Sequence, residues 1–106
     1  MEIPLEIDVT TAAQLLREGA LLLDVREPFE TAISVVPGSQ LVPMRQIPES
    51  LAELPRDRPI LVLCKVGMRS LRVTQYLRAN GFASVSNVAG GIDAWAEQID
   101  PSLPRY

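Results

Sequence analysis

The sequence contains no histidine and a single cysteine, Cys64. One cysteine cannot form a disulfide within the chain, so a disulfide scaffold is excluded. A structural zinc site would need histidine or cysteine ligands that this chain does not have, and no metal site is expected. The missing histidine also removes every mechanism in which an imidazole base activates a cysteine or serine nucleophile.

Long apolar runs and an excess of positive charge are missing as well. The longest apolar stretches, ALLLDV and ILVLC, are far shorter than the roughly 20 residues of a membrane-spanning helix. The acidic start MEIPLEID lacks the order of a signal peptide. A net charge of −3 disfavours general nucleic-acid binding. We therefore expect neither a nucleic-acid nor a membrane partner, and the default location is a reducing cytoplasm.

The remaining composition is that of one folded domain over residues 1–106, with 47% hydrophobic and 22% charged residues. Short apolar runs alternate with helical patterns along this domain. The expected strands are 20–25, 40–44, 60–64 and 83–88, and the expected helices are 10–19, 28–33, 47–54, 68–80 and 92–99. This alternation predicts an α/β fold with a central, mainly parallel sheet of about five strands and helices on both faces.

Local signals define the ends of several elements. In the first helix we expect threonines to cap the start, with Gln14 completing a capping box with Thr11, and Gly19 to end it. Gly90 and Gly91 are interpreted as a turn before the last helix. Trp95 is interpreted as a core residue rather than part of a binding surface.

Functional crevices in parallel sheets lie beyond the carboxyl ends of the strands. Asp24 and Arg26 stand at one such end, and Cys64 stands at another. The loop after Cys64 reads KVGMRS and contains Lys65, Val66, Gly67, Met68, Arg69 and Ser70. Gly67 permits a sharp turn, so that backbone N–H groups and the next helix N-terminus converge on one point. Such a loop lowers the pKa of a thiol and binds an anion. The alternative is that Cys64 is a small hydrophobe that completes a core strand.

The fragments LLLDVREPFETAISVVPGSQLVPM, ILVLCKVGMRS, LRANGF and VAGGIDAW resemble, in order and spacing, the rhodanese-like sulfurtransferases. The tail GGIDAWAEQIDPSLPRY is similar to the C-terminal rhodanese domain of the adenylyltransferase–sulfurtransferases, which activate sulfur-carrier proteins. Their ATP-using domain has no counterpart here, because the six glycines are too scattered for a nucleotide loop. No cofactor is expected.

The resemblance implies a rhodanese fold and a covalent mechanism. Cys64 would take sulfur from thiosulfate or from the persulfide of a cysteine desulfurase. It would hold that sulfur as a persulfide among the amides of residues 65–70 and pass it to cyanide, a thiol or a sulfur-carrier protein. Two positions depart from the family: Val35 stands where a histidine is usual, and Thr31 where an aromatic residue is frequent. Donor preference is expected to shift in consequence.

Several residues have two interpretations. Asp24 and Arg26 either support the active-site loop or form a scaffold ion pair. Arg69 either orients an anionic donor or braces the loop against a carboxylate. Ser70 is expected to cap or begin the following helix, besides lining the substrate site.

Two other functions compete with sulfur transfer. A cysteine-dependent phosphatase of the cell-cycle type shares the fold. The loop here has four residues between Cys64 and Arg69, one fewer than that phosphatase loop. No nearby acid has a clear leaving-group role either, since Asp93 follows on another element. The second alternative is a non-catalytic rhodanese-like docking module, although such modules typically lack the cysteine that this chain keeps.

Overall fold

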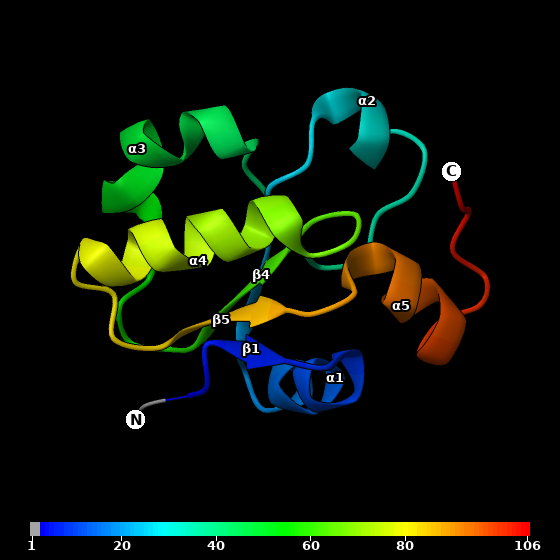
Figure 1. The fold of residues 1–106 in the computed structure, drawn as a ribbon, viewed down its shortest axis with the longest axis horizontal. Helices are drawn as coiled ribbons and strands as arrows, with labels where there is room; N and C mark the ends of the chain where they lie inside the picture. The colour runs from blue at the N-terminus through cyan, green and yellow to red at the C-terminus, as the bar shows by residue number, and fades with distance from the viewer. Residues whose placement is uncertain (1–2) are drawn as a thin grey trace.

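The computed structural model describes residues 3–106. A five-stranded parallel sheet in the order β1-β5-β4-β2-β3 forms its centre (Figure 1). The strands are β1 (Glu6–Ile7), β2 (Leu21–Asp24), β3 (Gln40–Leu41), β4 (Ile60–Leu63) and β5 (Val85–Val88). The helices are α1 (Val9–Arg17), α2 (Pro28–Thr31), α3 (Ile47–Ser50), α4 (Met68–Ala79) and α5 (Gly91–Gln98), with 3-10 turns at Met44–Gln46 and Leu51–Glu53.

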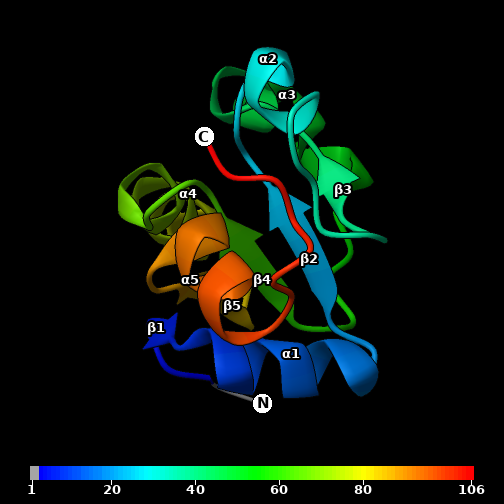
Figure 2. The ribbon, with the colours of Figure 1, turned by 90° about the vertical axis from the view of Figure 1, so that its right-hand side faces the viewer.

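Helices cover both faces of the sheet, as the alternation of elements predicted. Every residue of β2, β4 and β5 is buried. Burial on both faces explains the apolar runs of β2 and β4, whereas β5 also buries the polar residues Ser86 and Asn87. Leu22, Leu61 and Leu63 face the core under α1 and α5. The alternate strand residues face the second core, under α4 and the 44–54 segment; they are Leu21, Leu23, Ile60 and Val62. Figure 2 shows α1 below the sheet and the chain end crossing from α5 toward α2.

The expected start of the first helix is wrong by a few residues. The cap is Asp8, whose Oδ1 accepts a hydrogen bond from the Thr11 N–H at 2.8 Å, and Gln14 donates instead to Glu18 at 2.7 Å. A carboxylate at the cap satisfies the free N–H groups and complements the helix dipole, so the helix begins before the threonines. Gly19 follows the helix with φ 106°, as expected of its stop.

Two further expectations need correction. The fifth strand is β1, a two-residue edge strand before the first helix, where no sequence pattern indicated one. The predicted helix over 47–54 is a short α-helix between two 3-10 turns. Pro48 lies in the first turn of α3, where proline is tolerated, and it separates α3 from the preceding 3-10 turn. Pro55 holds Leu54 in an extended conformation, which ends the segment. Within residues 3–106, no helix combines the length and the apolar character needed to cross a bilayer.

The strand ends that carry the candidate residues are neighbours. Asp24 at the end of β2 is in register with Leu63, the last residue of β4, and Cys64 follows directly. The start of α5 approaches this edge closely. The Ile92 N–H donates to the carbonyl of Cys64 at 2.9 Å, and the Asp93 N–H donates to that of Lys65 at 3.1 Å. Gly91 is therefore more than the turn residue expected from the sequence, because it allows two chain segments to touch.

Replacing Gly91 with alanine tests this contact. A Cβ there would stand 2.5 Å from the Cys64 carbonyl oxygen and would also collide with that of Lys65, at a backbone φ of 59°. We expect Gly91→Ala to lower the free energy of unfolding by roughly 2–4 kcal/mol in urea titrations, since steric overlap adds to backbone strain. Gly38→Ala is the control, because Gly38 has φ 86° and open space around it. Gly38→Ala should lower the free energy of unfolding by only about 1 kcal/mol. Equal losses for the two variants would contradict a tight approach at Gly91.

Candidate active site

The Cys64 sulfur lies in a cradle formed by the loop that follows β4. Cys64 is 1% exposed, and its Sγ accepts hydrogen bonds from the N–H groups of Gly67 at 3.1 Å and Ser70 at 3.4 Å. The Ser70 Oγ lies 3.2 Å from the same sulfur. Gly67 takes φ 109°, which turns the chain into α4, so that the N-terminal end of this helix points toward the thiol.

This cradle favours the thiolate form of Cys64. Burial by itself raises the pKa of the Cys64 thiol, because it removes water from the charged form. Hydrogen bonds from the Ser70 hydroxyl and from the N–H groups of Ser70, Gly67 and Val66 act in the opposite direction and outweigh burial. The pKa of Cys64 therefore lies below its ordinary value. A thiolate is the nucleophilic form of cysteine, and this loop stabilises it without a neighbouring base.

The loop can direct its N–H groups inward because other elements satisfy its carbonyl groups. The start of α5 binds the carbonyls of Cys64 and Lys65, as described above. The carbonyl of Gly67 accepts a hydrogen bond from the Asn87 side-chain amide at 3.1 Å, and that amide also donates to Glu6 at 2.8 Å. The buried Asn87 of β5 thus ties the loop after Cys64 to the edge strand β1.

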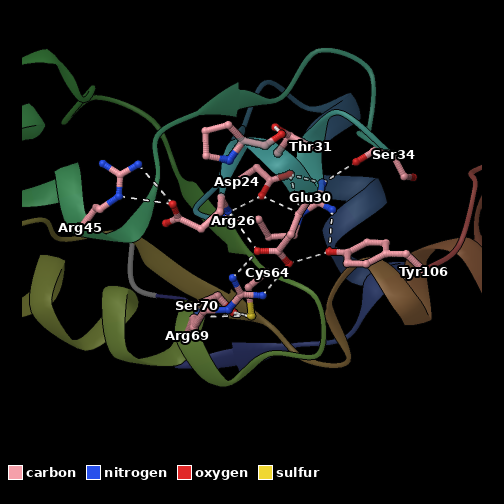
Figure 3. A network of polar contacts seen from close by, with 12 residues as sticks. Asp24, Arg26, Glu30, Thr31, Ser34, Arg45, Cys64, Arg69, Ser70 and Tyr106 are labelled. Atoms are coloured by element: carbon pink, nitrogen blue, oxygen red, sulfur yellow. Dashed lines mark hydrogen bonds and ion pairs between the residues drawn. The ribbon is translucent and has the colours of Figure 1, made fainter.

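Arg69 forms a two-pronged ion pair with Glu30 of α2. Its two terminal nitrogens lie 2.6 and 2.9 Å from the Glu30 oxygens, and the Glu30 side chain is 5% exposed. Tyr106 donates its hydroxyl hydrogen to Glu30 at 2.7 Å, so Glu30 lies between Arg69 and Tyr106 (Figure 3). Arg69 lowers the pKa of Glu30 to about 2 against the opposing effect of burial. Of the two interpretations of Arg69, the geometry favours the brace.

Asp24 and Arg26 form a buried ion pair beside this network. Their side chains are 0% exposed, and an Arg26 nitrogen lies 2.7 Å from Asp24 Oδ2. Arg26 also donates to the Ser34 carbonyl at 2.7 Å and to the Tyr106 hydroxyl at 3.0 Å. The pair therefore connects the end of β2 to the segment after α2 and to the chain end, which matches the scaffold interpretation.

Lys65 is paired as well. Its Nζ lies 3.1 and 3.0 Å from the two Asp93 oxygens and 4.7 Å from the centre of the Tyr106 ring. Asp93 lies on another element, as the sequence indicated, but α5 brings it to the loop. Both cations of the loop thus face a carboxylate rather than open solvent.

Of the remaining loop residues, Ser70 contacts the sulfur, whereas Val66 and Met68 face outward. Ser70 is the third residue of α4 rather than its cap or first residue, because the helix starts at Met68 after Gly67. Its hydroxyl contacts the cysteine sulfur instead. Val66 and Met68 contribute exposed apolar side chains, 53% and 69% accessible, on the outside of the loop. Trp95 is 4% exposed and lies in the core, as predicted.

Sequence reasoning missed Glu30, Asn87 and Tyr106, and did not connect Asp93 with Lys65. Glu30 and Tyr106 lie 39 and 37 residues from Arg69 along the chain, on opposite sides of it. A single glutamate in a short helix or a tyrosine after a proline-rich tail carries no local pattern. The one available signal was charge balance, since two loop cations near a buried thiol need carboxylate partners.

Comparisons with known proteins find relatives that match most of the chain. The family model described as "Rhodanese-like domain" matches residues 8–98. A sulfurtransferase of Allochromatium vinosum is 40% identical, with 86% of this chain and 87% of that protein covered. A solved rhodanese-like domain protein from Staphylococcus aureus is 33% identical with a TM-score of 0.81, and 95% of this chain and 97% of that chain are covered.

Longer proteins contain a similar segment. A rhodanese-like/PpiC domain-containing chloroplast protein of Arabidopsis thaliana is 44% identical over 84% of this chain, which spans 31% of that protein. A probable adenylyltransferase/sulfurtransferase, MoeZ, of Mycobacterium tuberculosis is 40% identical over 80% of this chain, which spans 22% of it. The resemblance to adenylyltransferase–sulfurtransferases that the tail suggested is confirmed.

The pairing of Glu30 with Arg69 predicts a pH-dependent contribution to stability. A carboxyl with a pKa of about 2 in the folded protein and 4.5 as its ordinary value stabilises the fold fully above pH 4.5. That contribution disappears as the pH falls toward 2. Glu30→Gln should therefore lower the free energy of unfolding by about 2–3 kcal/mol at pH 7, with the difference shrinking in acid.

Urea titrations at several pH values measure this effect. Glu97→Gln is the matched control, because Glu97 pairs with Arg105 at 3.5 Å on the surface, with side chains 65% and 50% exposed. Glu97→Gln should lower the free energy of unfolding by less than about 0.5 kcal/mol. A Glu30→Gln deficit that is the same at pH 7 and in acid would show that the carboxylate charge is not the cause.

The hydroxyl of Ser70 is expected to stabilise the thiolate. Ser70→Ala removes one hydrogen-bond donor near Sγ and keeps the backbone donors, so the pKa of Cys64 should rise toward that of a free thiol. The ultraviolet absorbance of the thiolate, followed against pH, reports this single cysteine once a Cys64→Ser blank is subtracted. Ser39→Ala is the control, because the Ser39 hydroxyl binds the Val36 carbonyl away from the loop. Coincident curves for Ser70→Ala and the unmodified protein would contradict a role of the hydroxyl.

Proposed function

The chain belongs to the rhodanese-like domain family, and from this premise we propose that it is a sulfurtransferase that carries sulfur on Cys64. The observation that carries the proposal is the cradle around the sulfur. Two backbone N–H groups and a hydroxyl contact Sγ, and the pKa of the thiol is lowered without a histidine. This environment supports a thiolate nucleophile and fits a persulfide anion at the same place.

In the first step, the Cys64 thiolate attacks the outer sulfur of a donor. With thiosulfate, the bond between the outer sulfur and the sulfonate group breaks, and sulfite leaves with the electron pair. With an organic persulfide, the bond between the two donor sulfurs breaks and a thiolate leaves. In both cases Cys64 gains one sulfur atom as a persulfide. The thiosulfate:cyanide reaction of rhodanese assays is one form of this chemistry.

In the second step, an outside nucleophile takes the terminal sulfur and Cys64 returns to its thiolate. The chain has one cysteine, so no second thiol of its own can form a disulfide with the persulfide. The acceptors that we propose are a small thiol or a sulfur-carrier protein, because relatives named adenylyltransferase and sulfurtransferase share this domain. A protein persulfide, such as that of a cysteine desulfurase, or thiosulfate is the proposed donor. A reducing cytoplasm suits an enzyme that works through a free thiolate.

Other site residues are proposed to hold the loop in shape. Arg69 binds Glu30 through two hydrogen bonds, and Asp24 with Arg26 supports Tyr106 and the segment after α2. The amides of residues 65–70 would receive the terminal sulfur of the persulfide. Val35 is half-buried where the family often has histidine. The hydrogen-bonded thiolate needs no proton acceptor, so this replacement is compatible with sulfur transfer.

Intact-protein mass spectrometry tests the proposal directly. After incubation with thiosulfate or a persulfide donor, the mass should increase by one sulfur atom, and cyanide should reverse the increase with release of thiocyanate. Cys64→Ser should reduce transfer to below about one per cent, because a serine hydroxyl stays protonated at neutral pH and no base is present to activate it.

Circular dichroism and urea titration serve as controls for folding of the Cys64→Ser variant. A folded Cys64→Ser protein that still gains a cyanide-labile sulfur would refute the assignment of the carrier residue. A wild-type protein that gains no sulfur from either donor would refute sulfur transfer itself.

A further inference from the structure

The charges around Cys64 are balanced in pairs. Three cationic side chains of the described residues lie around its loop, and each contacts its own carboxylate. Arg69 lies 2.6 Å from Glu30, Lys65 lies 3.0 Å from Asp93, and Arg26 lies 2.7 Å from Asp24. The loop therefore looks basic in the sequence, yet both of its cations, Lys65 and Arg69, are paired with carboxylates.

This balance has a consequence for the donor. Thiosulfate is a dianion at neutral pH, and its capture depends on uncompensated positive charge near the thiol. A cation that already binds a carboxylate offers little of this attraction. The backbone amides still stabilise negative charge, but only at the position of the transferred sulfur and not on the rest of the donor. A donor that carries less negative charge is less affected by the absence of this attraction.

The outer surface of the loop also suits a donor of low charge. Val66 is 53% exposed and Met68 is 69% exposed, and both lie on the outside of the loop. Phe29, which precedes Glu30 in α2, is 70% exposed. Glu30 links α2 to the loop through Arg69. Exposed apolar side chains therefore occur on both of the segments that this ion pair joins.

Building on the proposed sulfurtransferase function, we propose that Asp93 and Glu30 determine donor specificity. By cancelling the charges of Lys65 and Arg69, they direct the site toward organic persulfides and away from thiosulfate. In the favoured reaction, the Cys64 thiolate bonds to the outer sulfur of the persulfide R–S–SH, and the R–S⁻ thiolate leaves with the electron pair of the broken bond. The proton remains on the transferred sulfur or passes to water.

Asp93 provides the cleaner test of the two carboxylates. The Lys65 and Asp93 side chains are 30% and 27% exposed, so releasing Lys65 does not leave an unpaired charge in the core. Asparagine preserves the size and shape of the side chain. The backbone N–H of residue 93, which donates to the Lys65 carbonyl, is also kept. Glu30 is almost fully buried, and its replacement would disturb the loop itself.

The experiment measures the second-order rate constant of Cys64 persulfidation by rapid quench and intact mass. The donors are thiosulfate, which is a dianion, and the persulfide of N-acetylcysteamine, which carries at most one negative charge, on its terminal sulfur. Asp93→Asn should accelerate the thiosulfate reaction roughly three- to tenfold, the range expected for one added unit charge near a dianion in a solvent-exposed site. The rate with the persulfide should change less, by about two- to threefold at most, because this donor carries at most one negative charge where thiosulfate carries two.

Lys65 provides a second, independent measurement. Lys65→Ala exposes the charge of Asp93 and should slow the thiosulfate reaction, whereas Lys65→Ala combined with Asp93→Asn should return it close to wild type. This pattern distinguishes an effect of charge from damage to the loop. If the loop were damaged, the second substitution would lower the thiosulfate rate further instead of restoring it. High salt should remove the gain of Asp93→Asn, since screening acts on exposed charges.

Asp57→Asn is the matched control, because this exposed carboxylate precedes β4 and lies at the opposite end of that strand from Cys64. It should leave both rates unchanged. The inference is overturned if Asp93→Asn leaves the thiosulfate rate unchanged, or if it alters both donors equally. Absence of persulfidation by either donor in the wild type would instead overturn the sulfurtransferase function, and with it this inference.

Discussion

The loop after Cys64 must direct its N–H groups toward the sulfur and its carbonyl groups away from it. The other contacts around the loop follow from that constraint. Its N–H groups point inward to the Cys64 sulfur, so its carbonyl groups point outward and need donors of their own. Ile92 and Asp93 supply two of these donors from α5, and Asn87 supplies a third from β5. The approach of α5 is possible only because residue 91 lacks a side chain. The cradle around Cys64 therefore depends on elements that follow it in the sequence.

The ion pairs extend the same dependence to the rest of the chain. Glu30 reaches the loop from α2, and Tyr106 reaches Glu30 and Arg26 from the last position of the chain (Figure 3). The Tyr106 ring also contacts the Lys65 ammonium. Segments before, within and after the loop thus meet at the carboxyl edge of the sheet. A parallel sheet brings such strand ends together, and here β2 and β4 are adjacent and in register at that edge. The position of the thiol is consequently a property of the whole fold.

The sequence predicted the features that depend on local patterns. Buried strands, the position of Cys64 at a strand end, the turn at Gly67 and the left-handed stop at Gly19 all follow from apolar runs and glycine chemistry. The sequence did not indicate β1, because a two-residue edge strand has no periodicity. It also could not pair Arg69 with Glu30 or Lys65 with Asp93. Such partners are set by tertiary packing, which decides which charges meet, and this is why the two cations of the loop proved to be paired with carboxylates.

The use of backbone amides has a physical advantage over side-chain cations. An amide dipole stabilises negative charge at one place without contributing net charge at longer range. A thiolate and the persulfide formed from it are both monoanions, so the same amides can serve both states as sulfur is gained and lost. A free lysine or arginine would stabilise them too, but it would also hold any small anion from solution over the thiol. Pairing each cation with a carboxylate keeps the rigidity that an arginine fork provides and leaves the sulfur as the feature that the site recognises.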